Sequence, residues 1–133
     1  MKYSFLIIFF SLHLGCTSTP PKDNSDYKRI IGRTVKIHNL EIAQFDFPYK
    51  LDWISAKNAC QNMGNGWRLP TVEESDLLIR YNNKFENYVM GYYWTSQDIQ
   101  NCCSEVIDIS GKKEGSRYQD KGNKHWVRVV RNF

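Results

Sequence analysis

The sequence lacks any apolar run long enough to cross a bilayer, which requires about 20 consecutive apolar residues. Its longest apolar stretch extends from Tyr3 to Leu14 and follows the positively charged start Met1-Lys2. A short apolar run behind a basic start is typical of a signal peptide, which is removed from the mature protein. The N-terminus therefore predicts export of the chain.

The sequence also lacks the motifs of most catalytic and cofactor sites. It has no Gly-x-Ser-x-Gly, no His-Glu-x-x-His, no Gly-rich phosphate loop and no acidic loop of the EF-hand type. Beyond the predicted signal peptide the histidines are His38 and His125, and neither has a partner at the spacing of metal ligands. We expect no enzyme activity, no metal and no cofactor.

The end of the apolar run resembles a bacterial lipobox, the signal for cleavage before a cysteine that becomes lipidated. Gly15 precedes Cys16, although His13 stands where the motif usually has Leu. Several acyl chains hold a protein firmly, because each buried methylene contributes about 0.8 kcal/mol. We predict a signal peptide over residues 1–15 and a palmitate-type anchor on Cys16. The alternative is an ordinary secretory signal in which Cys16 is a chance residue.

The segment after Cys16 predicts a tether. Thr17 to Lys28 contains one aromatic residue and no aliphatic residue, so it cannot bury enough surface to offset its ordering entropy. We therefore predict a flexible tether over residues 16–28 and one domain over residues 29–133. Thr17 and Ser18 lack the Asp that retains lipoproteins at the inner membrane in some bacteria, which favours the outer membrane or cell surface of the envelope.

Two helices are predicted from caps and periodicity. Asp52 is a good N-cap, and the apolar residues that follow at helical spacing form one face: Trp53, Ala56, Cys60 and Met63. Gly64 to Gly66 ends that helix. Thr71 and Glu74 form a capping box for a second helix, with Val72, Leu78 and Ile79 on its apolar side.

The remaining segments predict strands. Residues 33–47 form two strands around a His38-Asn39 turn, and later strands are expected at residues 92–95, 103–109 and 125–130. The last of these is nearly all apolar, which is typical of a strand buried on both faces. The fold class is therefore α+β, with two helices packed on a small, mainly antiparallel sheet.

Several motifs in order resemble a bacterial domain of unknown function found at the C-terminus of Legionella collagen-like proteins. The matching residues are Trp53, Ala56, Cys60, Gly66 to Thr71, Glu73-Glu74, Tyr93 to Ser96, and Val127-Arg128 with Val130-Arg131. The resemblance implies a C-type-lectin-like fold in a secreted or surface protein. Ser75 departs from the family's usual Leu. Val129 stands where many members have a Cys, the implied disulfide partner of the helix cysteine.

The motif residues favour structural roles. Trp67, Arg68, Leu69, Pro70 and Thr71 belong to a tight entry into the second helix, and Trp94 is expected in the core rather than as a sugar-stacking platform. Tyr92, Tyr93 and Trp126 are the better candidates for exposed aromatic residues. The calcium motifs of sugar-binding C-type lectins, such as Glu-Pro-Asn and Trp-Asn-Asp, are missing.

The cysteines beyond the predicted anchor leave two possibilities. A bridge between neighbours Cys102 and Cys103 would be strained, and Cys103 lies in phase with apolar residues of its strand. If a disulfide forms, we predict Cys60–Cys103. Otherwise Cys60 is a buried free thiol that behaves as a small hydrophobic residue.

The net charge is +4, and the basic excess lies late in the chain. A candidate surface for an anionic ligand consists of Lys112, Lys113, Arg117, Lys121 and Lys124. The alternative is that these side chains only solvate loops. We expect a non-catalytic, membrane-anchored binding or adhesion domain, with an anionic glycan or an envelope protein as partner and no nucleic acid. The alternative function is a structural subunit that docks onto an envelope protein.

Overall fold

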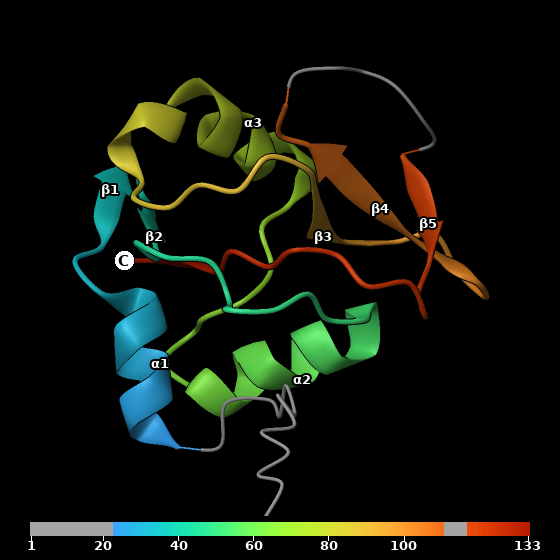
Figure 1. Ribbon diagram of the computed structural model, residues 1–133, viewed down its shortest axis with the longest axis horizontal. Coiled ribbons are helices and arrows are strands. Elements are labelled where there is room, and N and C mark those ends of the chain that lie inside the picture. The colour runs from blue at the N-terminus through green and yellow to red at the C-terminus, as the bar shows by residue number, and fades with distance from the viewer. Residues whose placement is uncertain (1–22, 111–116) are drawn as a thin grey trace, which may run out of the picture.

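The computed structural model describes residues 23–110 and 117–133 (Figure 1). This part of the chain is α+β, with three α-helices and two three-stranded antiparallel sheets. The elements, in order, are α1 (Asn24–Ile31), β1 (Val35–Ile37), β2 (Leu40–Ile42), α2 (Trp53–Met63), α3 (Val72–Arg80), the 3-10 turn η1 (Asn82–Lys84), β3 (Tyr92–Asp98), β4 (Cys103–Asp108), β5 (Tyr118–Asp120) and β6 (Val130–Asn132). The predicted α+β class is confirmed. The expected single sheet with two helices is corrected to two sheets and three α-helices in the described part of the chain.

The first sheet joins the two ends of the domain. Its strand order is β1-β2-β6, and Leu40 of β2 pairs with Asn132 of β6. The predicted turn between β1 and β2 is confirmed, and His38 adopts a positive φ of 55° there. The second sheet has the order β3-β4-β5 and is built from consecutive strands. The C-terminus therefore returns to the start of the domain.

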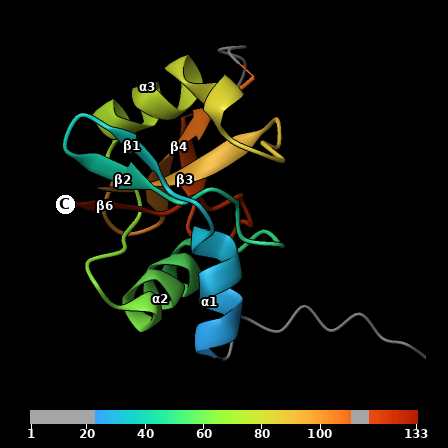
Figure 2. The ribbon, with the colours of Figure 1, turned by 90° about the vertical axis from the view of Figure 1, so that its left-hand side faces the viewer.

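Both predicted helices are confirmed, because their signals are local. Asp52 accepts a hydrogen bond from the backbone N–H of Ser55, and all four residues of the predicted apolar face of α2 are buried. Thr71 and Glu74 form the complete capping box of α3. The two helices lie on opposite sides of the molecule, and the C-terminal segment passes between them (Figures 1 and 2).

That C-terminal segment differs from the prediction. We expected a strand over residues 125–130, but regular pairing starts only at Val130. The preceding residues are extended and make isolated backbone bonds, such as Phe47 N–H to Val127 O at 2.9 Å and Ala43 N–H to Val129 O at 3.0 Å. The neighbouring chain at 43–51 is irregular, so no continuous ladder forms. The predicted burial on both faces is confirmed, since residues Val127 to Val130 are inaccessible to solvent.

The buried segments separate two apolar cores. One lies against α1 and α2 and contains Trp53, Trp94 and Val127, whereas the other lies under α3 and contains Leu78 and Tyr93. Neighbouring residues of β3 enter different cores, because successive side chains of a strand point to opposite faces. Within the described ranges, no helix has both the length and the apolar character needed to span a bilayer.

The helix α1 corrects the predicted tether. We expected flexible chain as far as Lys28, but Asn24–Ile31 forms a helix whose Tyr27 and Ile30 are buried in the first core. Figures 1 and 2 place α1 beside α2. The predicted signal peptide, Cys16 and the start of the tether lie outside the described residues.

Candidate functional site

A pocket of about 500 Å³ opens between α1 and the irregular chain that follows β2. We call it the α1 pocket. Its lining consists of Asp26, Arg29, Ile30, Phe45, Asp46, Pro48 and Tyr49. Small-molecule sites have volumes of about 300 to 1,000 Å³, with apolar walls and a few polar groups. The α1 pocket has this size and this character.

The pocket exists because α1 has defined ends. Asp23 is the N-cap, and its carboxylate accepts hydrogen bonds from Ser25 N–H at 2.7 Å and from Asp26 N–H at 3.2 Å. The Ser25 hydroxyl also donates to this carboxylate, and it lowers the pKa of Asp23 below its usual range together with the two backbone bonds. At the other end Gly32 donates to Lys28 O with a φ of 53°, and it packs so closely against Phe45 that a Cβ would lie 2.8 Å from Phe45 Cε2. The helix is therefore fixed against one wall of the pocket.

Asp46, one of the lining residues, belongs to a buried ion pair. Arg128 donates through Nε to Asp46 Oδ1 at 2.6 Å and through Nη1 to Gln44 O at 3.0 Å. Tyr93 Oη donates to Asp46 Oδ2 at 2.6 Å. Both carboxylate oxygens of Asp46 are thus engaged inside the protein. Asp46 therefore shapes the pocket and has little hydrogen-bonding capacity left for a ligand.

Arg128 itself is a buried charge beside two stacked aromatic rings. Its guanidinium lies 4.7 Å from the ring centre of Phe85 and 5.2 Å from that of Tyr88. Arg128 Nη2 and Tyr88 Oη are buried and have no hydrogen-bond partner among the described residues. Arg128 is the charged residue of the nearly apolar run at residues 125–130, and its contacts with Phe85 and Tyr88 of the second core explain how the run tolerates it.

Tyr49 is the polar group of the pocket that lacks an internal partner. Its hydroxyl is buried, and no described residue forms a hydrogen bond with it. Burial, together with the charge of Asp26, raises the pKa of Tyr49 to about 12, so the phenol is neutral at physiological pH. Asp26 and Arg29 lie one helical turn apart on α1, and Arg29 is exposed. The pocket therefore offers a neutral hydroxyl, a carboxylate and a guanidinium beside Ile30 and three ring-containing residues.

The predicted basic surface is only partly assembled. Lys112 and Lys113 lie outside the described residues. Arg117 forms an ion pair with Glu105, and Lys121 forms one with Asp98 at 2.7 Å. Lys124 is exposed, and its charge adds to the hydrogen bonds from Ser55, which outweigh burial and lower the pKa of Asp52. Two of the three described members of this surface are thus neutralised by carboxylates.

Lys121 also belongs to an aromatic corner at the start of α2. Its ammonium lies 4.9 Å from the ring centre of Trp53, and that of Lys57 lies 4.3 Å from the same ring. Trp53 is only 2% exposed, so the lysines cover a core side chain. The corner carries cations, but the indole is not available as a stacking platform.

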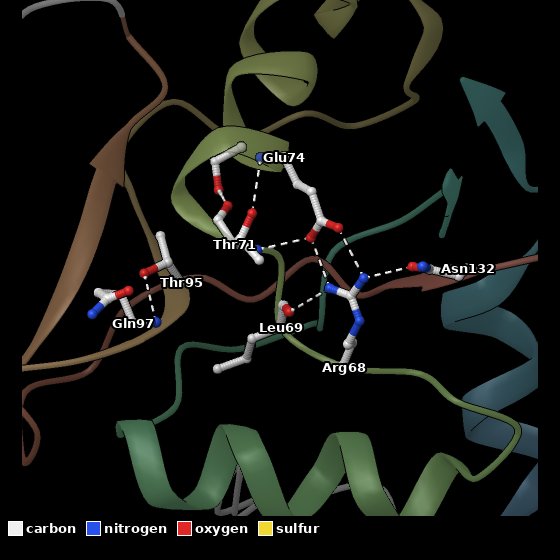
Figure 3. Close-up of polar contacts among 8 residues, drawn as sticks. Arg68, Leu69, Thr71, Glu74, Thr95, Gln97 and Asn132 are labelled. Carbon is white, nitrogen blue, oxygen red and sulfur yellow. Dashed lines mark hydrogen bonds and ion pairs between the residues drawn. The ribbon is translucent and has the colours of Figure 1, made fainter. Parts of the chain in front are cut away.

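The motif between α2 and α3 has the structural role that we predicted. Figure 3 shows Arg68 donating to both carboxylate oxygens of Glu74, at 2.7 and 2.8 Å, and to Asn132 Oδ1 at 2.6 Å. Glu74 Oε2 accepts in turn from Thr71 N–H. The pKa of Glu74 lies below its usual range, chiefly because of Arg68. This network joins the cap of α3 to β6.

The aromatic residues of the motifs are mostly buried. Trp67, Leu69, Pro70 and Trp94 are buried, and Trp94 Nε1 donates to Leu51 O at 2.7 Å. Tyr92 and Trp126 are half-buried, but the expectation of an exposed Tyr93 is wrong, because Tyr93 is 1% exposed. Its hydroxyl turns inward to the carboxylate of Asp46.

The predicted disulfide pairing is wrong. The structure joins Cys102 to Cys103, and Cys60 is a buried free thiol, as the alternative prediction stated. Burial raises the pKa of Cys60 to about 12. Val129, where the resembling family often has cysteine, lies in the same core as Cys60. The spacing of Cys103 with the apolar residues of its strand placed it near a core. That spacing could not show that Cys103 is bonded to its neighbour Cys102 and not to Cys60.

The α1 pocket was not predicted from the sequence, although the sequence contains a local signal for helix α1. Asp23 followed by Asp26 marks a helix start, and Tyr27, Ile30 and Ile31 have the spacing of one helical face. Their approach to Phe45 and Tyr49 is a tertiary contact, which no local pattern reports.

Neither possible metal ligands in the described residues nor similarity to known proteins assigns a function to the chain. In residues 23–110 and 117–133, no group of three or more His, Cys, Asp or Glu side chains could hold a metal ion. No protein-family model matches the sequence, and no curated protein matches it significantly.

Proposed function

We propose that the chain is a non-catalytic binding protein of the cell envelope, with a C-type-lectin-like domain held to a membrane by lipid on Cys16. The α1 pocket is its ligand site. The observation that carries the proposal is the buried Tyr49 hydroxyl in a pocket of about 500 Å³, with no hydrogen-bond partner in the described chain. A buried unsatisfied hydroxyl lowers stability by about 1–3 kcal/mol. The Tyr49 hydroxyl is covered from solvent in this conformation, so a ligand relieves this loss only when the Tyr49 side chain shifts towards the pocket.

A glycan is the ligand class that best fits the lining. Sugar hydroxyls both donate and accept, which matches the mixture of Asp26, Arg29 and Tyr49. The apolar faces of sugar rings fit against Phe45 and Pro48. Arg29 also lets the pocket take an acidic sugar, because a guanidinium can form two parallel hydrogen bonds with a carboxylate. The anionic glycan expected from composition is thereby assigned to the α1 pocket rather than to the late lysines.

The test is a glycan array probed with the chain lacking residues 1–15 and carrying Cys16→Ser. We expect Tyr49→Phe to weaken binding about tenfold, which corresponds to 1.4 kcal/mol, and Arg29→Ala to weaken acidic glycans most. The matched control is Tyr88→Phe, which removes another buried, unpartnered hydroxyl from a residue that does not line the pocket. Equal effects of the two tyrosine variants, or no glycan binding at all, would argue against the proposal.

The anchor is tested separately. Cells that produce the wild-type chain and a Cys16→Ser variant are labelled with a palmitate analogue. We expect label only on the wild type. Equal labelling of both proteins would remove the anchor from the proposal and leave the pocket untouched.

A further inference from the structure

The bond between adjacent cysteines at the tip of the β3–β4 hairpin is poorly suited to stabilising the fold. We define this hairpin tip as residues 98–103. A disulfide stabilises chiefly by closing a loop in the unfolded chain, and the effect grows with loop length. Cys102 and Cys103 are separated by one position, so their bond closes almost no loop. Its contribution to stability through loop closure is therefore small.

We propose that the Cys102–Cys103 bond is a thiol–disulfide exchange site, reduced by a dithiol, whose redox state controls the conformation of the hairpin tip. The proposal is independent of the α1 pocket. Its reactants are the two sulfur atoms and an external dithiol of the thioredoxin-like or small-molecule class.

The position of the pair makes it accessible. Cys102 is exposed and Cys103 is half-buried, whereas Cys60 is 3% exposed. A dithiol can therefore approach Cys102 without unfolding the domain, but it cannot approach Cys60. The Cα atoms of the pair are only 3.7 Å apart, below the 4.4–6.8 Å that is usual for disulfides. Exposed and geometrically restrained disulfides are the more easily reduced ones.

The backbone of the tip stores conformational strain. Gln100 and Asn101 both have positive φ, at 59° and 42°. Asparagine tolerates this region, but glutamine rarely adopts it, so the conformation of Gln100 persists only where surrounding bonds impose it. Cys103 N–H donates to Gln100 O at 3.1 Å, and Ile99 N–H donates to Cys103 O at 3.0 Å. Reduction of the disulfide opens the small ring that Cys102 and Cys103 form. Gln100 and Asn101, which precede that ring, are then free to leave the left-handed region.

A chain of hydrogen bonds connects the tip to α2. Lys121 N–H donates to Cys102 O at 2.8 Å, and Trp53 N–H donates to Lys121 O at 3.0 Å. The side chain of Lys121 forms its ion pair with Asp98, which also accepts from Gln100 N–H at 2.8 Å. The tip, β5 and the start of α2 meet at the right of Figure 1. A changed position of the Cys102 carbonyl therefore alters the backbone hydrogen bonds that Lys121 makes to Cys102 and Trp53.

Reduction proceeds by two successive thiol–disulfide exchanges. A thiolate of the dithiol attacks Cys102 Sγ, the Cys102–Cys103 bond breaks, and Cys103 sulfur leaves as a thiolate that takes up a proton. The second thiol of the reductant then displaces Cys102. Two electrons and two protons pass to the protein, and the dithiol becomes a disulfide.

The experiment uses the purified chain with its sulfurs oxidised. Dithiothreitol is added in steps, free thiols are trapped with N-ethylmaleimide, and the sites are mapped by mass spectrometry. We expect Cys102 and Cys103 to be alkylated while Cys60 is not and while far-UV circular dichroism is unchanged. Amide exchange at Lys121 and Trp53 should become about tenfold faster as the local opening equilibrium shifts.

Two variants serve as controls. Cys60→Ala should behave as the wild type throughout. The double variant Cys102→Ser with Cys103→Ser should show fast exchange at Lys121 with or without dithiothreitol. Three results would each overturn the proposal: both adjacent cysteines trapped before any dithiol is added, reduction only together with loss of helix signal and labelling of Cys60, or unchanged amide exchange at Lys121 after complete reduction.

Discussion

Arg128 and Asp46 form an ion pair across 82 positions of sequence, with Nε and Oδ1 2.6 Å apart and side-chain exposures of 0% and 5%. Removing one partner of such a buried pair leaves an uncompensated charge and costs about 3–5 kcal/mol. We therefore expect Asp46→Ala to lower the free energy of unfolding by that amount in urea denaturation followed by tryptophan fluorescence. Asp76→Ala, at an exposed acid of α3, should change it by less than about 0.5 kcal/mol. Similar losses in the two variants would contradict the assigned role of the pair.

The tyrosine hydroxyls near this pair predict opposite responses to the same chemical change. Tyr93 Oη donates to Asp46 and accepts from Val89 N–H at 3.2 Å, whereas Tyr88 Oη has no partner within the described structure. We expect Tyr93→Phe to destabilise by about 1.5–3 kcal/mol, the range for hydrogen bonds to charged groups. Tyr88→Phe should leave stability unchanged or raise it. Urea midpoints of the two variants provide the check, and a loss in Tyr88→Phe as large as in Tyr93→Phe would refute the comparison.

Acid should destabilise the domain in two separate steps. Burial, and secondarily the charge of Lys50, lowers the pKa of His125, so the folded state holds fewer protons than the unfolded state. This stability is complete above the unfolded pKa of about 6.5 and is lost as the pH falls towards the lower folded pKa. Glu74 and Glu41 have pKa values lowered chiefly by Arg68 and Arg131. Their contribution is lost in a second step, below about pH 4.3.

The two steps are separated by substitution. His125→Phe should remove the decline that begins near pH 6.5 and keep the one that begins near pH 4.3. His38→Asn is the control, because His38 is exposed and asparagine tolerates the positive φ of that turn. Urea midpoints measured from pH 8 to about pH 2.5, well below the unfolded glutamate pKa, give the curves. If His38→Asn flattens the first step and His125→Phe does not, the assignment is reversed.

Local signals predicted those parts of the fold whose physics is local. The caps at Asp52 and Thr71 depend on residues three positions away, and both were correct. Burial of residues 127–130 was also correct, but their pairing depends on the irregular partner at 43–51, which the segment itself does not encode. Composition did not predict helix α1, because a short helix gains most of its stability from tertiary packing. In α1 this packing is made by Tyr27 and Ile30.

The candidate site was less predictable than the fold. One side of the α1 pocket comes from residues 26–30 and the other from residues 45–49. The two sides meet only after β1 and β2 have reversed the direction of the chain. The lysine surface was inferred from charge alone. Composition counts cations but does not report that Glu105 and Asp98 neutralise Arg117 and Lys121.

Gly32 and Gly64 allow the contribution of the pocket wall to be measured. Both glycines end a helix with positive φ, 53° and 66°. A Cβ at Gly32 would lie 2.8 Å from Phe45, whereas a Cβ at Gly64 would meet no atom within 4 Å. The ψ values of −142° and −165° place both in a region that is essentially restricted to glycine, so alanine at either position incurs a backbone penalty of about 1–3 kcal/mol. Only alanine at Gly32 must also displace a wall of the α1 pocket.

We therefore expect Gly32→Ala to destabilise the domain by about 1–3 kcal/mol more than Gly64→Ala, the range for overpacking a well-packed site. Urea denaturation of the two variants gives this difference directly, because the backbone terms cancel. Gly32→Ala should also weaken glycan binding, since displacement of Phe45 changes the pocket, whereas Gly64→Ala should bind as the wild type does. Equal stability losses with equal binding would mean that Phe45 moves aside without effect, and that the contact between α1 and its wall does not define the pocket.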